Sequence, residues 1–509
     1  MQKQLKRVFL AFILLQPFLD VYFFYVPPLS TLFSFSISTI IRLILILVVA
    51  VMFVISERFS RRDWLIFTYI GALAIYFVLH VWNASHFISV NPNNFHFSLV
   101  GEAFYVLRML VPLFTLFVTN RLDFTESTIT KVIQILVGLI SGSIVITNLF
   151  GFALASYGGG WITGSIFTWF SSAVGGSYYG LASKGFFYFA NAISAVEILL
   201  TPLILYVVFK RLNWLNGILA FSQLLAMFML GTKTSTYGFI GMAGLFVIAY
   251  LTHTLLLKNV KFEWSHLAII AALLVVATAL VPISPNSNRA NFDVSVQTTR
   301  KETEKQAKIK TLEKRLDAQL VGKTAAERKP ILVKYIKKNW SRYSLNKKFV
   351  FESYSYKNDP EFWFGVMRWP IAERLNYRQV EQAMLDHVKA YNHNPLDAWF
   401  GITYTRMNNI FNLEQDFVSQ WYSMGYLGVL LLLMPYVFVG VYGVYAWLRY
   451  AAVRQFYVSA LLLGVVAMVG ASVYSGNVMD FLTDTILLGF FEGVMIAAIR
   501  RAKQGRLSA

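Results

Sequence analysis

Long apolar runs alternate with short polar connections over most of this chain. A helical run of about 20 apolar residues is long enough to cross the hydrocarbon core of a bilayer. Such runs occur at about 8–26, 33–55, 64–82, 99–118, 129–149, 187–209, 214–230, 236–257, 266–282, 417–446, 456–475 and 481–499. The pattern predicts an all-α polytopic membrane protein with about twelve transmembrane helices.

Two of the connections are much longer than the others. Residues 150–186 contain the stretch GGGWITGSIFTWFSSAVGGSYYG, which is too polar to span a bilayer. This segment fits either a re-entrant or interface-lying loop or an ordinary surface loop. Residues 282–416 are rich in charges, with a helical pattern near 298–340. The part at 298–320 alternates in charge and has little apolar face, which predicts a solvated helix, with a specific binding face as the alternative.

Lysine and arginine gather in alternate connections, on one side of the predicted helices. The residues concerned are Lys3, Lys6, Arg7, Arg58, Arg61, Arg62, Arg121, Lys131, Lys210, Arg211, Lys258, Lys261, Arg449, Arg454, Arg500, Arg501, Lys503 and Arg506. The opposite connections 27–32, 83–98 and 476–480 contain no lysine or arginine. The positive-inside rule then places both termini in the cytoplasm. Residues 282–416 fall outside, because long loops translocate largely regardless of their charge.

The chain is therefore expected to divide into three regions. Residues 1–281 hold the first nine helices and the glycine- and aromatic-rich loop. Residues 282–416 form a large extracytoplasmic loop domain between spans nine and ten. Residues 417–509 hold the last three helices and a basic cytoplasmic tail.

Composition supports membrane insertion and removes several classes of function. Only 14% of the residues are charged, whereas soluble domains carry about 25%. The net charge of +19 reflects the basic connections and anionic lipid headgroups, since no nucleic-acid recognition motif accompanies it. The chain has no cysteine and lacks Walker A, GxSxG, dinucleotide-binding and HExxH motifs. We therefore expect no cofactor, no bound metal and no nucleic-acid partner.

Several charged residues fall inside the predicted spans, where they are functional candidates by default. They are Asp20, Arg42, Glu102, Arg108 and Glu197. Glu102 and Arg108 are six residues apart and lie on different faces of one helix, so each needs a partner from another element. A supporting role at a site and a purely structural pairing both explain them.

A phosphate-binding cation is predicted in the short outer turn between spans seven and eight. Lys233 lies there in GTKTSTYG, among hydroxyl and backbone N–H donors suited to a phosphate. The alternative is a lysine that snorkels to the membrane interface. Arg374 and Arg378, with Arg368 and Arg406 nearby, add guanidinium groups that can bind a diphosphate, although isolated surface arginines are common.

Two carboxylates precede the tenth span, at the junction between the charged region and an apolar helix. Glu414 and Asp416 are followed by the spaced pair Gly425 and Gly428. Burial raises the pKa of a carboxyl group towards neutral pH, so a carboxylate at a partly dry boundary can serve as a general base. The alternative is that Glu414 only caps the tenth helix.

Four stretches carry a resemblance to a known family. They are LLQPFLDVY near the start, KGFFYFANAISAVEILLTPL at 184–203, LGTKTSTYGFIG at 230–241 and FGITYTRMNNIFNLEQDFVSQWYSMGYLG at 400–428. Together with the twelve spans and the large outer loop, they resemble the O-antigen ligase and O-antigen polymerase superfamily. That resemblance implies a membrane glycosyltransferase that acts on polyprenyl-diphosphate-linked glycans at the outer face of the membrane.

The resemblance also suggests roles for single residues. The ligases carry a histidine and then an asparagine before a Gly-x-x-Gly pair, and alignment on Gly425 and Gly428 places Glu414 and Gln415 at those positions. Lys233 stands where the family has an arginine. The outer-loop arginine corresponds to Arg374 or Arg378. Supporting positions are Arg108, Glu102 and Asn191. These replacements retain charge and acid/base capacity, but they leave the ligase subtype open.

The sequence thus predicts an enzyme that polymerises or ligates undecaprenyl-diphosphate-linked glycan repeat units. Lys233 and Arg374 or Arg378 would hold the diphosphate, and Glu414 would act as general base, with Asp416 beside it. No metal ion is required, because the diphosphate is already an activated leaving group. The partners would be the lipid-linked donor, a glycan or surface acceptor, and the bilayer. The alternatives are a transporter or flippase of lipid-linked oligosaccharides and a non-enzymatic scaffold.

Overall fold

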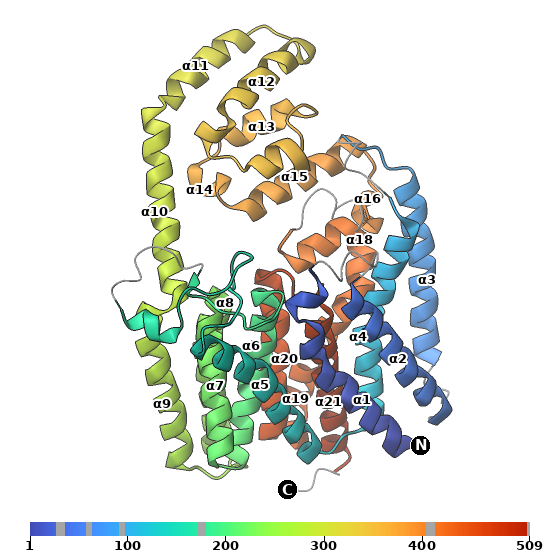
Figure 1. Cartoon of the computed structure of the whole chain (residues 1–509). Helices are drawn as coiled ribbons and strands as arrows, with labels where there is room; N and C mark the ends of the chain where they lie inside the picture. Colours follow the sequence, from blue (N-terminus) through green and yellow to red (C-terminus); the bar gives the residue numbers. More distant parts are fainter. Residues whose placement is uncertain (27–35, 57–63, 91–96, 172–179, 404–412, 506–509) are drawn as a thin grey trace. The chain divides into compact units, whose positions relative to one another are not determined.

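The computed structural model describes residues 1–26, 36–56, 64–90, 97–171, 180–403 and 413–505. Over these residues the protein is built from helices and a few isolated β-bridges (Figure 1). The longer helices are α1 Gln2–Leu19, α2 Ile37–Ser56, α3 Trp64–Ser85, α4 Leu99–Leu122, α5 Glu126–Leu149, α6 Ala190–Lys210, α7 Trp214–Leu230, α8 Lys233–Leu251, α9 Trp264–Leu280, α10 Pro285–Gln306, α11 Ile309–Leu320, α12 Ala325–Asn339, α13 Pro360–Met367, α15 Tyr377–Asn392, α18 Asp416–Leu432, α19 Met434–Arg449, α20 Phe456–Tyr474 and α21 Leu482–Lys503. Two four-residue helices, α14 Ile371–Arg374 and α16 Asp397–Phe400, complete the set used below.

The membrane class expected from hydropathy is confirmed. Within the described residues, ten helical stretches are long and apolar enough to cross a bilayer. Helices also lie at the other two predicted positions, but α7 has only 17 residues and α1 carries three basic residues within its 18. The count of twelve spans therefore stays a prediction, whereas the all-α, multi-pass architecture is established.

The chain folds into two compact units, each of which is described by itself. The first unit comprises residues 1–64, 106–290 and 432–509. The second comprises residues 65–105 and 291–431. Helices α3, α4, α10 and α18 each contribute residues to both units.

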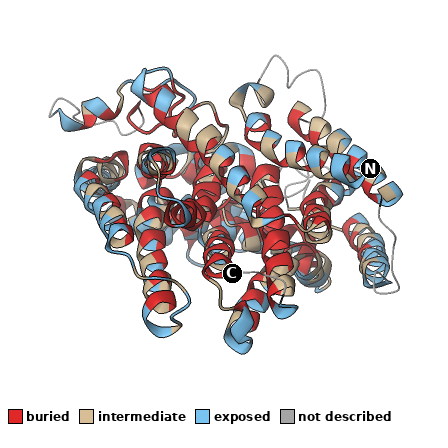
Figure 2. Ribbon diagram, turned by 90° about the horizontal axis from the view of Figure 1, so that it is seen from below, coloured by how far each residue is buried: buried red, intermediate tan, exposed pale blue. Residues whose placement is uncertain are grey.

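Helix α6 is the centre of the first unit. Almost every one of its side chains from Ala190 to Phe209 is buried, since α5, α7, α8, α20 and α21 pack around it. A helix that is apolar on all sides is expected to be enclosed in this way. The outer helices instead carry buried residues along one side and exposed residues along the other, as Figure 2 shows. Within α6, Glu197 accepts a hydrogen bond from Ser141 of α5 at 2.9 Å, which gives this buried carboxyl a partner.

Helices α11, α12, α13 and α15 form the apolar core of the second unit. Leu316, Leu332, Trp363 and Met384 are buried in it. The prediction of a solvated helix at 298–320 is wrong for α11, because Ile309, Leu316 and Leu320 are buried in this core. These three residues are seven and four positions apart and so share one helix face, which the dense charges around them obscured.

Glycines allow a close backbone approach at the start of the tenth predicted span. Gly425 has φ +70° and interrupts α18, and a Cβ there would lie 2.3 Å from the carbonyl carbon of Trp399. Gly401, with φ +80°, approaches Ser423 in the same manner. The backbone N–H of Ile402 donates to the carbonyl of Tyr422 at 2.8 Å and fixes this contact. The predicted span 417–446 lies within one apolar helical stretch, Asp416–Arg449, which comprises α18 and α19 with Leu433 between them.

Candidate functional site

Lys233 is the first residue of α8 and follows a turn of only two residues. Gly231 adopts φ +66°, and the Thr232 side chain caps the helix by accepting from the N–H of Ser235 at 2.9 Å. The turn is shorter than expected, and the hydroxyl groups of Thr232 and Ser235 face the protein interior rather than the surface. Lys233 itself is exposed. A cation at this position lies beside the positive end of the helix dipole, which costs roughly 0.3–1 kcal/mol unless an anion is bound.

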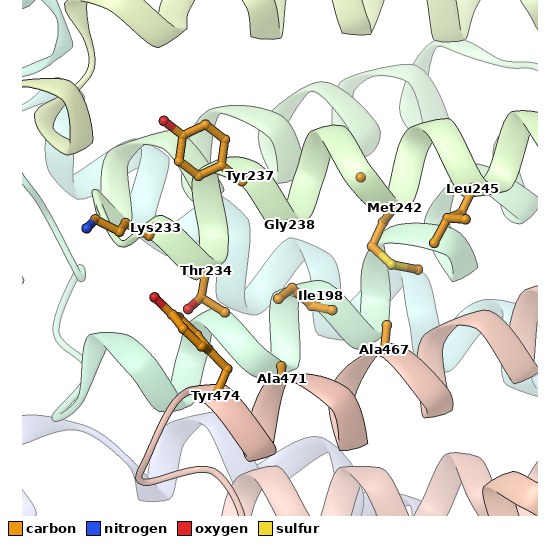
Figure 3. A pocket seen from close by; sticks show the side chains of 11 residues that line it. Ile198, Lys233, Thr234, Tyr237, Gly238, Met242, Leu245, Ala467, Ala471 and Tyr474 are labelled. Carbon is orange, nitrogen blue, oxygen red and sulfur yellow. The ribbon is translucent and has the colours of Figure 1, made fainter. Parts of the chain in front are cut away.

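A groove of about 460 Å³ runs along α8 from this lysine. Its lining residues are Ile198, Lys233, Thr234, Tyr237, Gly238, Gly241, Met242, Leu245, Ala467, Ala471 and Tyr474. They come from α6, α8 and α20, all within the first unit. Figure 3 shows the polar atoms of Lys233, Tyr237 and Tyr474 at one end, and Met242 and Leu245 at the other. The groove therefore has a cationic, hydroxyl-bearing head and an apolar body.

Arg374 serves the fold of the second unit. Its guanidinium is buried and pairs with Glu304 at 2.9 Å. Its Nε donates to the carbonyl of Trp369 at 2.9 Å, and Nη1 donates to the carbonyl of Tyr343. Removing one partner of a buried ion pair costs roughly 3–5 kcal/mol. These contacts give Arg374 a structural role in the second unit.

Arg378, by contrast, lies at the surface beside Glu414. Its Nη2 donates to Oε2 of Glu414 at 3.0 Å, and the two side chains are 31% and 44% exposed. The dry surroundings expected for Glu414 belong instead to Glu381, which is only 8% exposed. Burial, reinforced by the negative charge of Glu414, raises the pKa of Glu381 to about 8. A pKa of about 8 favours the protonated form of Glu381 at neutral pH, and the guanidinium of Arg378 pairs with Glu414.

Sequence reasoning missed Glu381. Arg378 and Glu381 are three residues apart on α15 and so share one face of that helix. This spacing was a visible signal. Nothing in the sequence indicated that the same face meets the segment before α18.

The remaining candidates occupy varied positions. Asp416 begins α18 and is buried, two residues beyond Glu414. Glu102 and Arg108 have partners on other elements, as expected: the imidazole of His80 lies 3.2 Å from Glu102, and Arg108 pairs with Asp480 at 2.5 Å. Asn191 is partly buried in the first turn of α6. Arg406 falls outside the described residues.

The intramembrane charges near the N-terminus form a buried network in the first unit. Arg42 Nη2 donates to Asp20 Oδ1 and to Thr483 Oγ1, both at 2.6 Å. Its Nε donates to Gln16 Oε1 at 2.8 Å. The network joins α1, α2 and α21, which explains the polar residues within the LLQPFLDVY stretch as a structural link.

Bundled apolar helices and an amphipathic groove define a multi-pass membrane protein. The comparison with known families is more specific, because the model of the family described as O-antigen ligase like membrane protein matches residues 2–502. The chain belongs to this family. No curated protein is similar enough to count as a match.

Proposed function

We propose that the protein is a membrane glycosyltransferase that polymerises or ligates glycan repeat units carried on undecaprenyl diphosphate, in the synthesis of a cell-surface polysaccharide. Membership of the family supports glycan ligation at a membrane. The observation that carries the proposal is the groove along α8. A cation at its head and an apolar body fit an amphiphile with an anionic headgroup and a long hydrocarbon chain.

The proposed reaction is a displacement at the anomeric carbon of the donor sugar. The acceptor hydroxyl oxygen forms a bond to this carbon while the bond from the carbon to the diphosphate oxygen breaks. The electron pair of the broken bond leaves with the diphosphate, and Glu414 takes the hydroxyl proton. Lys233 neutralises charge on the leaving diphosphate, as cations aimed at developing charge do. A guanidinium such as that of Arg378 can donate to a carboxylate and to a phosphate oxygen at once.

Turnover of a purified lipid-linked glycan tests the proposal. The protein in lipid vesicles is given undecaprenyl-diphosphate-linked repeat units, and the products are measured by mass spectrometry. Lys233→Ala removes a charge-assisted contact worth roughly 1.5–3 kcal/mol, so we expect kcat/KM to fall by about one to two decades. Lys233→Arg should retain part of the activity. Lys261→Ala, at an exposed lysine beyond the other end of α8, is the matched control.

Filling the groove separates binding of the lipid chain from binding of the headgroup. A Cβ at Gly241 meets no atom within 4 Å, and Gly241 lines the groove, so Gly241→Leu adds its side chain there from an unobstructed Cβ. We expect a higher KM for the lipid-linked donor. Gly244 has the same open surroundings on the same helix but does not line the groove, and Gly244→Leu is the control.

The assay also distinguishes a transporter from an enzyme. If the protein moves the lipid-linked glycan between leaflets and forms no new glycosidic bond, it is an exporter and the proposed function is wrong. A Lys233→Ala protein with the wild-type kcat/KM would show that Lys233 does not bind the diphosphate.

A further inference from the structure

We propose that the loop between α5 and α6 binds the lipid headgroup region of the bilayer, on the side of the membrane where α5 ends and α6 begins. The surface concerned is defined by five exposed aromatic side chains, which we call the aromatic face. They are Phe150, Phe152, Trp161, Phe167 and Phe170, with exposed fractions of 74%, 44%, 55%, 68% and 69%. A lipid surface is the partner that the following features favour.

Three rings of the aromatic face, those of Phe150, Phe152 and Trp161, are joined through Phe186. The ring centroids of Phe150 and Phe152 are 6.2 Å apart, and those of Phe152 and Phe186 are 6.0 Å apart. Trp161 contacts Phe186 edge-on at 6.3 Å. These three exposed rings are therefore one contiguous cluster rather than scattered apolar residues, and contiguous exposed apolar patches mark interaction sites.

The short 3₁₀ helix at Ile166–Phe170 (η5) directs two more rings outward. In a 3₁₀ helix, residues three apart lie on the same side. Ile166 and Trp169 are buried, and Phe167 and Phe170 are exposed on the other side. The backbone N–H of Ile166 donates to Asn148 Oδ1 at 2.9 Å, which attaches this helix to the end of α5. The fold thus keeps the side chains of Phe167 and Phe170 exposed at the surface.

Charge and position favour lipid over a glycan as the partner. Residues 151–183 contain no charged side chain. The face continues the exposed apolar side of α5, where Ile146 and Leu149 directly precede Phe150. Tryptophan concentrates at the membrane–water interface, and segments that lie in this interface bury tryptophan, phenylalanine and leucine at the headgroup boundary. The end of a membrane-spanning helix lies at the same depth.

Docking of this loop has a consequence for the start of α8. The backbone N–H of Ser183 donates to the carbonyl of Met229 at 2.7 Å, and the Tyr157 hydroxyl donates to the carbonyl of Gly231 at 3.3 Å. The loop therefore holds the two-residue turn that precedes Lys233. Anchoring the aromatic face would keep Lys233 at the depth of lipid headgroups, a consequence that rests on the proposed function, whereas the docking itself does not.

The absence of cysteine allows a direct test with single spin labels. Phe167→Cys and Phe170→Cys are labelled with a nitroxide in vesicles of phosphatidylethanolamine and phosphatidylglycerol, with no glycan present. Collision rates with oxygen and with a water-soluble nickel chelate report the depth of each label. Ile248→Cys, on the exposed side of α8, is the lipid-facing control, and Val321→Cys, at a 79% exposed connection between α11 and α12, is the aqueous control.

We expect the ratio of oxygen to nickel-chelate collisions at positions 167 and 170 to lie between the high ratio at position 248 and the low ratio at position 321. Nickel-chelate access equal to that at Val321→Cys would overturn the proposal. So would access that falls only when a lipid-linked glycan is added, which would identify a sugar-binding surface instead. Because the measurement uses no donor and no turnover, its failure is distinguishable from failure of the proposed glycosyl transfer.

Discussion

Single residues decide the proton chemistry, and Glu414 is the residue on which the proposed reaction depends. Glu414→Gln keeps the shape of the side chain and removes its proton acceptor. If Glu414 is the general base, turnover at saturating donor should fall by roughly 100- to 10,000-fold, with donor binding nearly unchanged. Asp416→Asn should be milder, because a carboxylate at a helix start contributes only about 0.5–2 kcal/mol.

The second unit contains a close control for this variant. Arg328 and Glu361 form an ion pair at 2.8 Å whose side chains are 31% and 44% exposed, the same fractions as those of Arg378 and Glu414. Exposed pairs contribute only about 0–1 kcal/mol to stability, so Glu361→Gln should leave turnover near the wild-type level. Equal losses in the Glu414 and Glu361 variants, or a fully active Glu414→Gln protein, would leave Glu414 as a structural residue.

Residue types were easier to predict from the sequence than residue partners. Charges inside apolar spans are visible in any window of sequence, and Glu102 and Arg108 were each expected to need a partner. The identities of those partners, His80 and Asp480, depend on how distant helices pack. The preference between Arg374 and Arg378 likewise depends on burial, which pairs Arg374 with Glu304 and leaves Arg378 at the surface.

At the scale of elements, Gly425 interrupts α18, the helix that begins two residues after Glu414. Gly425→Ala forces an L residue into the left-handed region and overlaps the backbone of Trp399. Strain of this kind costs of order 1–3 kcal/mol before the overlap is counted, so the melting temperature should fall. Gly365→Ala on α13 meets no atom within 4 Å and should raise it slightly, since alanine is the better helix former. A Gly425→Ala protein as stable as the wild type would show that this backbone approach is not required.

Helix positions followed from hydropathy because apolar runs of membrane length have few alternatives. The interruptions of these helices did not follow from hydropathy. The break at Gly425, the left-handed Lys308 between α10 and α11, and the early start of α8 at Lys233 are set by local turn geometry and long-range packing. Charge-dense α11 shows the same limit, because its buried face consists of only three residues in a segment of mostly polar sequence.

At the scale of the whole molecule, orientation in the membrane is the property on which the proposed reaction depends most. Short connections rich in lysine and arginine stay on the cytoplasmic side, whereas long loops cross largely regardless of their charge. The basic balance of residues 282–416 is therefore compatible with an outer location. The proposed glycosyl transfer takes place at the outer face, so the side on which this region lies is a requirement of the proposed mechanism.

The cysteine-free chain allows this orientation to be measured directly. Leu212→Cys places a thiol at an exposed position just after α6, and Val321→Cys places one between α11 and α12. In intact cells a membrane-impermeant maleimide should modify Val321→Cys but not Leu212→Cys, and permeabilisation should expose both. A tag after Ala509 should also require permeabilisation. Modification of Leu212→Cys alone in intact cells would reverse the topology and contradict glycosyl transfer at the outer face, because residues 282–416 would then lie in the cytoplasm.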